Sequence, residues 1–129
     1  MKNYYGEPIQ GYFEKEKRGK LTGTYGGGQV RTDSITLSKG VYVVSVSCKS
    51  DTSSGNKLTT GDYQGRVQTD KGVLVESCHT GNGAYDLSFS ASGIVNLESE
   101  TSVYAVAQTG SSHAVNGGVR VVLRAVKVN

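Results

Sequence analysis

The stretch GVYVVSVSC, Gly40 to Cys48, decides the fold class of this chain. Successive side chains of a β-strand point to opposite faces. One face of the run carries Tyr42, Val44, Val46 and Cys48. The other face is valine in its first half and serine in its second half. The run therefore predicts a strand with one end that is apolar on both faces, so something besides the domain's own core must cover that end.

Similar runs of Val, Ile, Thr and Tyr recur along the chain and are separated by clusters of Gly, Ser, Asn and Asp. This pattern predicts an all-β domain without a helix of useful length. In the run VRVVLRAVKV, Val119 to Val128, the basic residues have helical spacing, but the density of valine favours a strand. Strands are expected at 29–37, 41–49, 63–69, 73–79, 85–91, 93–97, 103–109 and 119–128.

The composition bounds the size of the core. The chain has 129 residues, of which 36% are hydrophobic, with 18 Gly and no Trp. This length suits one domain. A domain with so little apolar material buries only a modest core, so association with partner subunits is expected to help it.

The charge pattern argues against binding to nucleic acid. The formal net charge is +3 and comes from mixed signs, whereas tracking of phosphates requires basic residues gathered on one face. The only dense charge run, EKEKR at 14–18, alternates in sign and is interpreted as a solvated loop or hinge.

The sequence also argues against insertion into a membrane. No segment approaches the ~20 apolar residues that span a bilayer. The N-terminus lacks the apolar core of a signal peptide. We therefore expect a soluble protein that is made in the cytoplasm.

Residues 1–28 differ from the remainder of the chain. They hold half of the tyrosines, the only proline and the Gly26–Gly28 run, with weak alternation. Two interpretations stay open: a segment that attaches the protein to a partner, or an edge strand that wraps the same core. The domain proper is expected to span 29–129.

Catalytic, metal and cofactor chemistry is not indicated. The sequence SSH, Ser111 to His113, places a hydroxyl beside a base, but neighbours in sequence seldom have the required geometry. The carboxylates are scattered singly through turns, and Glu98 and Glu100 are expected to solvate theirs. Cys48 and Cys78 lack zinc-site spacing and are interpreted as buried thiols, with their pairing left open.

Three motifs resemble the superfamily of complement globular heads and tumour necrosis factor. ITLSKGVYVVSVSC is similar to the first core strand of that superfamily. A Gly-x-Tyr precedes this strand in the superfamily, and Gly40 and Tyr42 match it. SGIVNLESETSVYAVA resembles a short strand, a charged turn and the strand after it. NGGVRVVLRAVKV resembles the glycine-containing last strand. The resemblance covers roughly residues 29–128 and implies a jelly-roll β-sandwich of about eight to ten antiparallel strands.

The resemblance also implies a homotrimer. The second face of Gly40–Cys48 then meets the three-fold axis, with Tyr42 at the subunit contact and the last strand beside it. A loop packed over the outer face of a central strand is the alternative, because such a strand is also apolar on both sides.

These inferences predict a non-enzymatic, trimeric binding domain. Exposed loops carry binding residues on rigid β scaffolds, and four ring-bearing residues lie in or beside the expected loops. The candidate ligand-binding residues are Tyr63, His79, Tyr85 and His113. The expected ligand is a cell-surface glycan or protein.

Members of the superfamily without a collagen-like stalk occur on bacteriophage fibres, so the resemblance implies a virion-surface or fibre-head protein that is attached through residues 1–28. Two alternatives remain. One is a structural decoration or assembly subunit of a phage particle, and the other is a monomeric carbohydrate-binding module.

Overall fold

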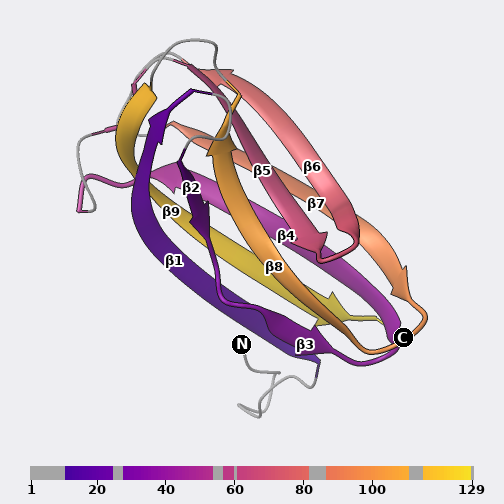
Figure 1. Ribbon diagram of the computed structural model, residues 1–129. Coiled ribbons are helices and arrows are strands. Elements are labelled where there is room, and N and C mark those ends of the chain that lie inside the picture. The colour runs from indigo at the N-terminus through magenta and orange to yellow at the C-terminus, as the bar shows by residue number, and fades with distance from the viewer. Residues whose placement is uncertain are drawn as a thin grey trace.

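The alternation of apolar and polar residues produces long strands with one buried face. The computed structural model describes residues 11–24, 28–53, 57–59, 61–81, 87–110 and 115–128, with only the backbone for 78–81. In this part of the chain, nine antiparallel strands form two packed sheets (Figure 1). The four-stranded sheet has the order β1 (Tyr12–Gly23), β9 (Val115–Lys127), β4 (Gly40–Ser50) and β7 (Ser88–Leu97). The five-stranded sheet has the order β2 (Gln29–Arg31), β8 (Thr101–Thr109), β5 (Gly61–Thr69) and β6 (Gly72–Gly81), and β3 (Ile35–Leu37) also pairs with β8.

The chain passes repeatedly from one sheet to the other, which is the topology of a jelly roll. Only the turn between β5 and β6 and the path from β2 to β3 stay within a sheet. The predicted all-β sandwich of eight to ten antiparallel strands is therefore confirmed.

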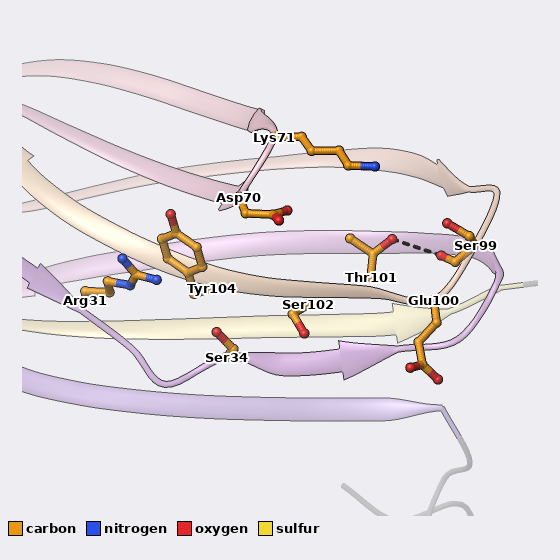
Figure 2. A pocket seen from close by; sticks show the side chains of 9 residues that line it. All are labelled: Arg31, Ser34, Asp70, Lys71, Ser99, Glu100, Thr101, Ser102 and Tyr104. Carbon is orange, nitrogen blue, oxygen red and sulfur yellow. Dashed lines mark hydrogen bonds between the residues drawn. The ribbon is translucent and has the colours of Figure 1, made fainter.

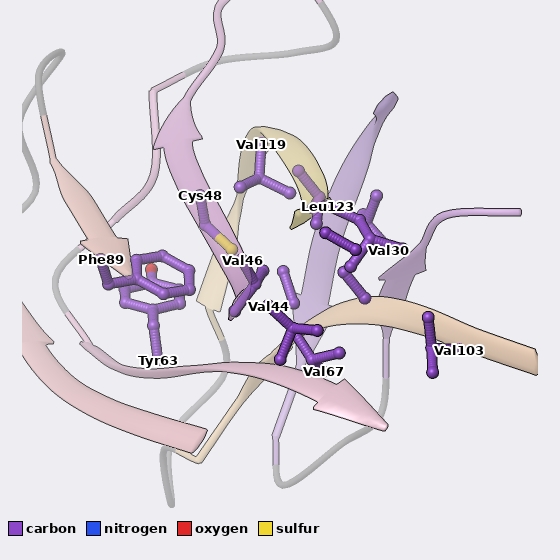
Figure 3. Close-up of a cluster of buried hydrophobic side chains, with 14 of the residues drawn as sticks. Val30, Val44, Val46, Cys48, Tyr63, Val67, Phe89, Val103, Val119 and Leu123 are labelled. Carbon is purple, nitrogen blue, oxygen red and sulfur yellow. The ribbon is translucent and has the colours of Figure 1, made fainter. Parts of the chain in front are cut away.

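The core lies between the two sheets, and β4 supplies its centre (Figure 3). Tyr42, Val44 and Val46 are 0% exposed, and Cys48 is 2% exposed. Cys48 is a free thiol, as the interpretation of it as a small buried hydrophobe required. Burial in apolar surroundings raises the pKa of this thiol to about 12, so it stays protonated at neutral pH.

Two of the expected strand boundaries are wrong. The single strand expected at 29–37 is divided into β2 and β3. Between them, the side chain of Thr32 turns inward, and its hydroxyl oxygen accepts a hydrogen bond from the backbone N–H of Ala105 in β8. The two strands expected at 85–91 and 93–97 are one strand, β7. The Ser-Gly pair at 92–93 does not break the strand, because it stays paired with β4 throughout.

Within residues 1–28, the described residues 11–24 and 28 include an edge strand. Residues 12–23 form β1, which pairs with β9 along its whole length. Residues 1–10, also part of the expected attachment segment, lie outside the described residues. The EKEKR run is not a loop or hinge but the middle of β1. Glu14, Glu16 and Arg18 lie on one face of that edge strand, and Lys15 and Lys17 lie on the other.

Candidate interaction surfaces

Apolar side chains form a row across the outer face of the four-stranded sheet. The register places Val126 beside both Tyr12 and Val43, and Val43 beside Ile94. Ile94 is 75% exposed, Val43 is 37% exposed, and Val128, two residues after Val126, is 55% exposed. We call Tyr12, Val43, Ile94, Val126 and Val128 the apolar band. It explains why β4 begins apolar on both faces: its inner face fills the core and its outer face contributes to this band.

Two ion pairs lie beside the apolar band and join β1 to β9. Arg124 Nε lies 2.9 Å from Glu14 Oε1. Arg120 donates from Nε and Nη2 to the two carboxylate oxygens of Glu16, at 2.7 and 3.0 Å. Arg18 Nε also donates to Glu16, at 3.1 Å. These exposed pairs contribute little stability individually, but they place fixed charges of both signs next to an exposed apolar row.

Small hydroxyl side chains continue this outer face along β4 and β7. Ser45 pairs with Ser92, and Ser47 pairs with Ser90, in the register of β4 and β7. A hollow of about 320 Å³ lies over this part of the sheet, between these strands and Arg120 of β9. Because the serines project so little, a second surface can approach the backbone closely here.

The Glu16 carboxylate gives this face a testable pH dependence. Hydrogen bonds from Arg120 and then Arg18 lower its pKa from the ordinary 4.5 to about 2. A carboxyl group with a depressed pKa in the folded state stabilises the fold above its unfolded pKa, and the contribution is lost as the pH falls from 4.5 towards 2. We expect a titration of the Glu16 carboxyl carbon by NMR to have its midpoint near 2.

Arg120→Gln is expected to move that midpoint back towards 4.5, because it removes the strongest cause of the shift. Arg124→Gln is the matched control, since Arg124 pairs with Glu14 instead. An unchanged midpoint in Arg120→Gln would show that the bidentate pair does not persist in solution.

The outer face of the five-stranded sheet is polar, and many of its side chains bond to one another. Gln29 Nε2 donates to Gln108 Oε1, and Gln108 Nε2 donates to Gln64 Oε1, both at 2.7 Å. Arg66 Nη2 donates to the same oxygen of Gln64 at 3.0 Å, and Arg66 Nε lies 3.2 Å from Glu76 Oε2. In the middle of this face the side chains therefore bond mainly to one another, although Arg66 Nε is buried and has only the ion pair with Glu76 and no hydrogen bond.

A pocket of about 430 Å³ lies at one end of the same sheet. We call it the Tyr104 pocket. Figure 2 shows Arg31 of β2 beside the ring of Tyr104, with Asp70 and Lys71 on the hairpin between β5 and β6 and Glu100 just before β8. The Arg31 Cζ lies 3.5 Å from the centroid of the Tyr104 ring. The remaining lining residues carry hydroxyl groups: Ser34, Ser99, Thr101 and Ser102.

The structure corrects the prediction for two tyrosines. Tyr42 is 0% exposed and its hydroxyl donates to Ser38 O at 2.9 Å, so it is a core residue and not a trimer contact. Tyr63 is also 0% exposed, lies stacked on Phe89 and donates to Thr59 O, so it presents no ring to a ligand. Both face inward because they share a strand face with core valines.

The other predicted ligand residues stay predictions. His79 lies on β6, and only its backbone is described. Its Cα is the register partner of Tyr63. Tyr85 and His113 lie outside the described residues. Of the four predicted ligand residues, the structure therefore describes the side chain of Tyr63 alone.

Sequence reasoning missed both the apolar band and the Tyr104 pocket. The valine at 43 was visible as an apolar residue on the second face of its strand. Its neighbours come from three other strands, however, and no local pattern gives their register. The pocket is assembled from three separate segments, 31–34, 70–71 and 99–104, and each has the sequence of an ordinary polar turn or strand end.

Among the residues that the structure describes, no group of three or more His, Cys, Asp and Glu side chains is placed to hold a metal ion. The described residues also include no helix long and apolar enough to cross a membrane.

Comparison with known proteins shows a shared fold and no sequence family. No family model matches the chain, and no curated protein matches it. A chain of the cyanophage Pam1 capsid asymmetric unit matches with a TM-score of 0.50 and 18% identity, over 93% of this chain and 89% of that chain.

Two further solved structures match more distantly. The globular domain of zebrafish complement 1qA has a TM-score of 0.48 and 13% identity, over 89% of this chain and 98% of that one. A carbohydrate-binding module of family 6 from the LamC laminarinase of Zobellia galactanivorans has a TM-score of 0.42 and 15% identity, over 85% and 98%. In two other matches this chain covers only 24% and 18% of the length of the solved chain. The chain thus has a β-sandwich fold, which the phage capsid chain shares.

Proposed function

We propose that this chain is a non-enzymatic binding domain that assembles as a homotrimer on a virus particle, with the outer face of the four-stranded sheet at the subunit interface. The apolar band is the observation that carries this proposal. Three of the four large hydrophobic residues that are exposed in the described part of the chain, Val43, Ile94 and Val128, belong to it. Contiguous exposed apolar surface typically marks an interaction site.

The remainder of the same face is suited to contact with another subunit. The serine rows allow close approach of an opposing backbone, and the Glu14–Arg124 and Glu16–Arg120 pairs offer both signs of charge to a neighbour. The lean composition, 36% hydrophobic, gives a further reason for association, because interface burial supplements a modest core.

The virion setting rests on the earlier resemblance and is consistent with the fold shared with the phage capsid chain. In this proposal the trimer presents its loops to a glycan or protein of a cell surface, with His79, Tyr85 and His113 as ligand residues. The alternative of a purely structural assembly subunit uses the same trimer without an external ligand.

The decisive test is the native mass in solution, measured by light scattering behind size exclusion. We expect three times the chain mass of 13.6 kDa for the wild type. Ile94→Asp places a carboxylate in the apolar band and is expected to yield a monomer with unchanged circular dichroism, because burial of an unpaired charge at an interface costs several kcal/mol.

Val73→Asp is the matched control. Val73 is also exposed, at 45%, but it lies on β6 of the other sheet, so this variant is expected to remain a trimer. A monomeric wild type would overturn the proposal. A trimer that survives Ile94→Asp would place the interface elsewhere.

A further inference from the structure

The Tyr104 pocket differs from the polar network beside it in how its side chains are paired. Gln64, Arg66 and Gln108 are bonded to one another across the strands. Among the described residues, the side chains of Asp70 and Glu100 have no hydrogen-bond or ion-pair partner. Unpaired charged groups that line one concavity are the groups by which small-molecule sites hold polar ligands.

Arg31 is fixed in position without using its hydrogen-bonding groups. Its guanidinium lies over the Tyr104 ring, with Cζ 3.5 Å from the centroid, and it has no hydrogen-bond or ion-pair partner among the described residues. Stacking of this kind orients a guanidinium and leaves the N–H groups in its plane free to donate. Arg31 therefore presents an oriented donor edge at the pocket.

Tyr104 forms the floor of the pocket and is itself fixed. It is 8% exposed, and its hydroxyl accepts a hydrogen bond of 2.8 Å from Gln68 Nε2. Because the hydroxyl oxygen is already an acceptor for Gln68, its own proton is available to a ligand. Figure 2 shows Asp70 reaching over the space beside this hydroxyl from the hairpin between β5 and β6.

The lining specifies the charge and polarity of a ligand. Arg31 and Lys71 are balanced by Asp70 and Glu100, so the pocket does not select a net anion or cation. Tyr104 supplies the only ring, and no aliphatic side chain lines the pocket, so the ligand has no apolar group to bury. A neutral molecule with hydroxyl groups on all sides fits these conditions. An amino-acid zwitterion with an apolar side chain fits these conditions less well, because that side chain needs an apolar subsite.

We propose that the Tyr104 pocket binds a neutral sugar residue of a glycan. Arg31 donates to adjacent hydroxyl oxygens, Asp70 accepts from adjacent hydroxyl protons, and the Tyr104 hydroxyl donates to a third oxygen. The volume of about 430 Å³ lies within the ~300–1,000 Å³ range of small-molecule sites. Within the proposed binding domain, this gives the glycan a site at one end of the five-stranded sheet, lined by its strands and by the turns at 70–71 and 99–100.

The inference rests on the proposed role as a binding domain but not on the trimer, since the pocket lies on the sheet opposite the apolar band. A monomer that binds sugar would overturn the trimer alone. A trimer that binds no sugar would overturn the sugar site alone.

The test begins with a panel of immobilised neutral oligosaccharides of glucose, galactose and mannose. The best-bound oligosaccharide is then titrated into the full ¹⁵N-labelled chain and followed by NMR. We expect saturable shifts of the backbone amides of Lys71, Thr101 and Ser102. Asp70→Asn and Arg31→Lys are each expected to weaken binding at least about tenfold. Asp70→Asn removes hydrogen bonds to a charged group, and Arg31→Lys removes the planar geometry of the guanidinium donors.

Glu98→Gln is the matched control. Glu98 lies in the same charged turn as Glu100 but does not line the pocket, so its affinity is expected to stay within about twofold of the wild type. Thermal unfolding of each variant separates loss of binding from loss of fold. The proposal is overturned if no neutral oligosaccharide binds, if Asp70→Asn and Arg31→Lys bind as tightly as Glu98→Gln, or if glycine or inorganic phosphate causes the same amide shifts.

Discussion

Gly117→Ala is expected to destabilise the fold by about 3 kcal/mol or more, from two sources of strain. Gly117 has φ +148, a backbone conformation that side chains with a Cβ rarely adopt. A Cβ at this position would lie 2.5 Å from Leu58 Cα and 2.6 Å from Lys57 O. Both are backbone atoms, so no side-chain rotation relieves the contact.

The segment that faces Gly117 is also held in place. Leu58 is 0% exposed and its backbone N–H donates to Ser50 Oγ at 3.0 Å. Thr59 exchanges hydrogen bonds of 3.0 Å with Asn116, which adjoins Gly117. The clash therefore has to displace a buried leucine or break these bonds.

Gly72→Ala provides the control that separates the two sources of strain. Gly72 has φ +147, nearly the same as Gly117, but a Cβ there would have nothing within 4 Å. We expect this variant to lose only about 1–2 kcal/mol, from the backbone conformation alone. Urea denaturation of both variants measures the difference, and equal losses would show that segment 57–59 yields without cost.

The inward face of β4 was predictable because it needs only local information. Alternation within Gly40–Ser50 separates Tyr42, Val44 and Val46 from the residues between them, and all three are buried. The same alternation places Tyr42 in the core, so its assignment to a subunit contact arose from the family resemblance and not from the strand pattern.

The boundaries of β7 could not be predicted, because they depend on contacts from the opposite sheet. Gly93 has the composition of a turn, but a Cβ there would lie 2.7 Å from Val75 Cγ1. Gly93 is therefore a strand position at which the valine of β6 leaves no room for a side chain. A sequence pattern does not distinguish this reason for glycine from a turn.

The role of the EKEKR run depends on partners far away along the chain. Glu16 is paired with Arg120, 104 residues later, and Glu14 with Arg124. Alternating charges suit both a solvated loop and the outer edge of a sheet. Only the pairing of β1 with β9, a long-range contact, selects the strand. The apolar band and the Tyr104 pocket were missed for the same reason, since each combines several distant segments.

Tyr63→Ala is expected to destabilise the domain by about 3–5 kcal/mol, the usual range for truncation of a buried aromatic ring. The Tyr63 ring is 0% exposed and stacks on Phe89, with centroids 5.6 Å apart and an interplanar angle of 17°. Truncation leaves a cavity between β5 and β7 and removes the partner of Phe89. Thermal or urea unfolding measures the loss.

Tyr63→Phe separates the ring from the hydroxyl. It keeps the stacked ring and removes the hydrogen bond to Thr59 O, so we expect a loss of only about 1 kcal/mol. A ligand-binding tyrosine at a loop would behave differently. Ligand binding would fall in both variants, and the free energy of unfolding would change little. If Tyr63→Ala unfolds at the same urea concentration as the wild type, the ring does not pack in the core. If stability falls and the remaining folded fraction binds glycan as before, Tyr63 acts only through the fold.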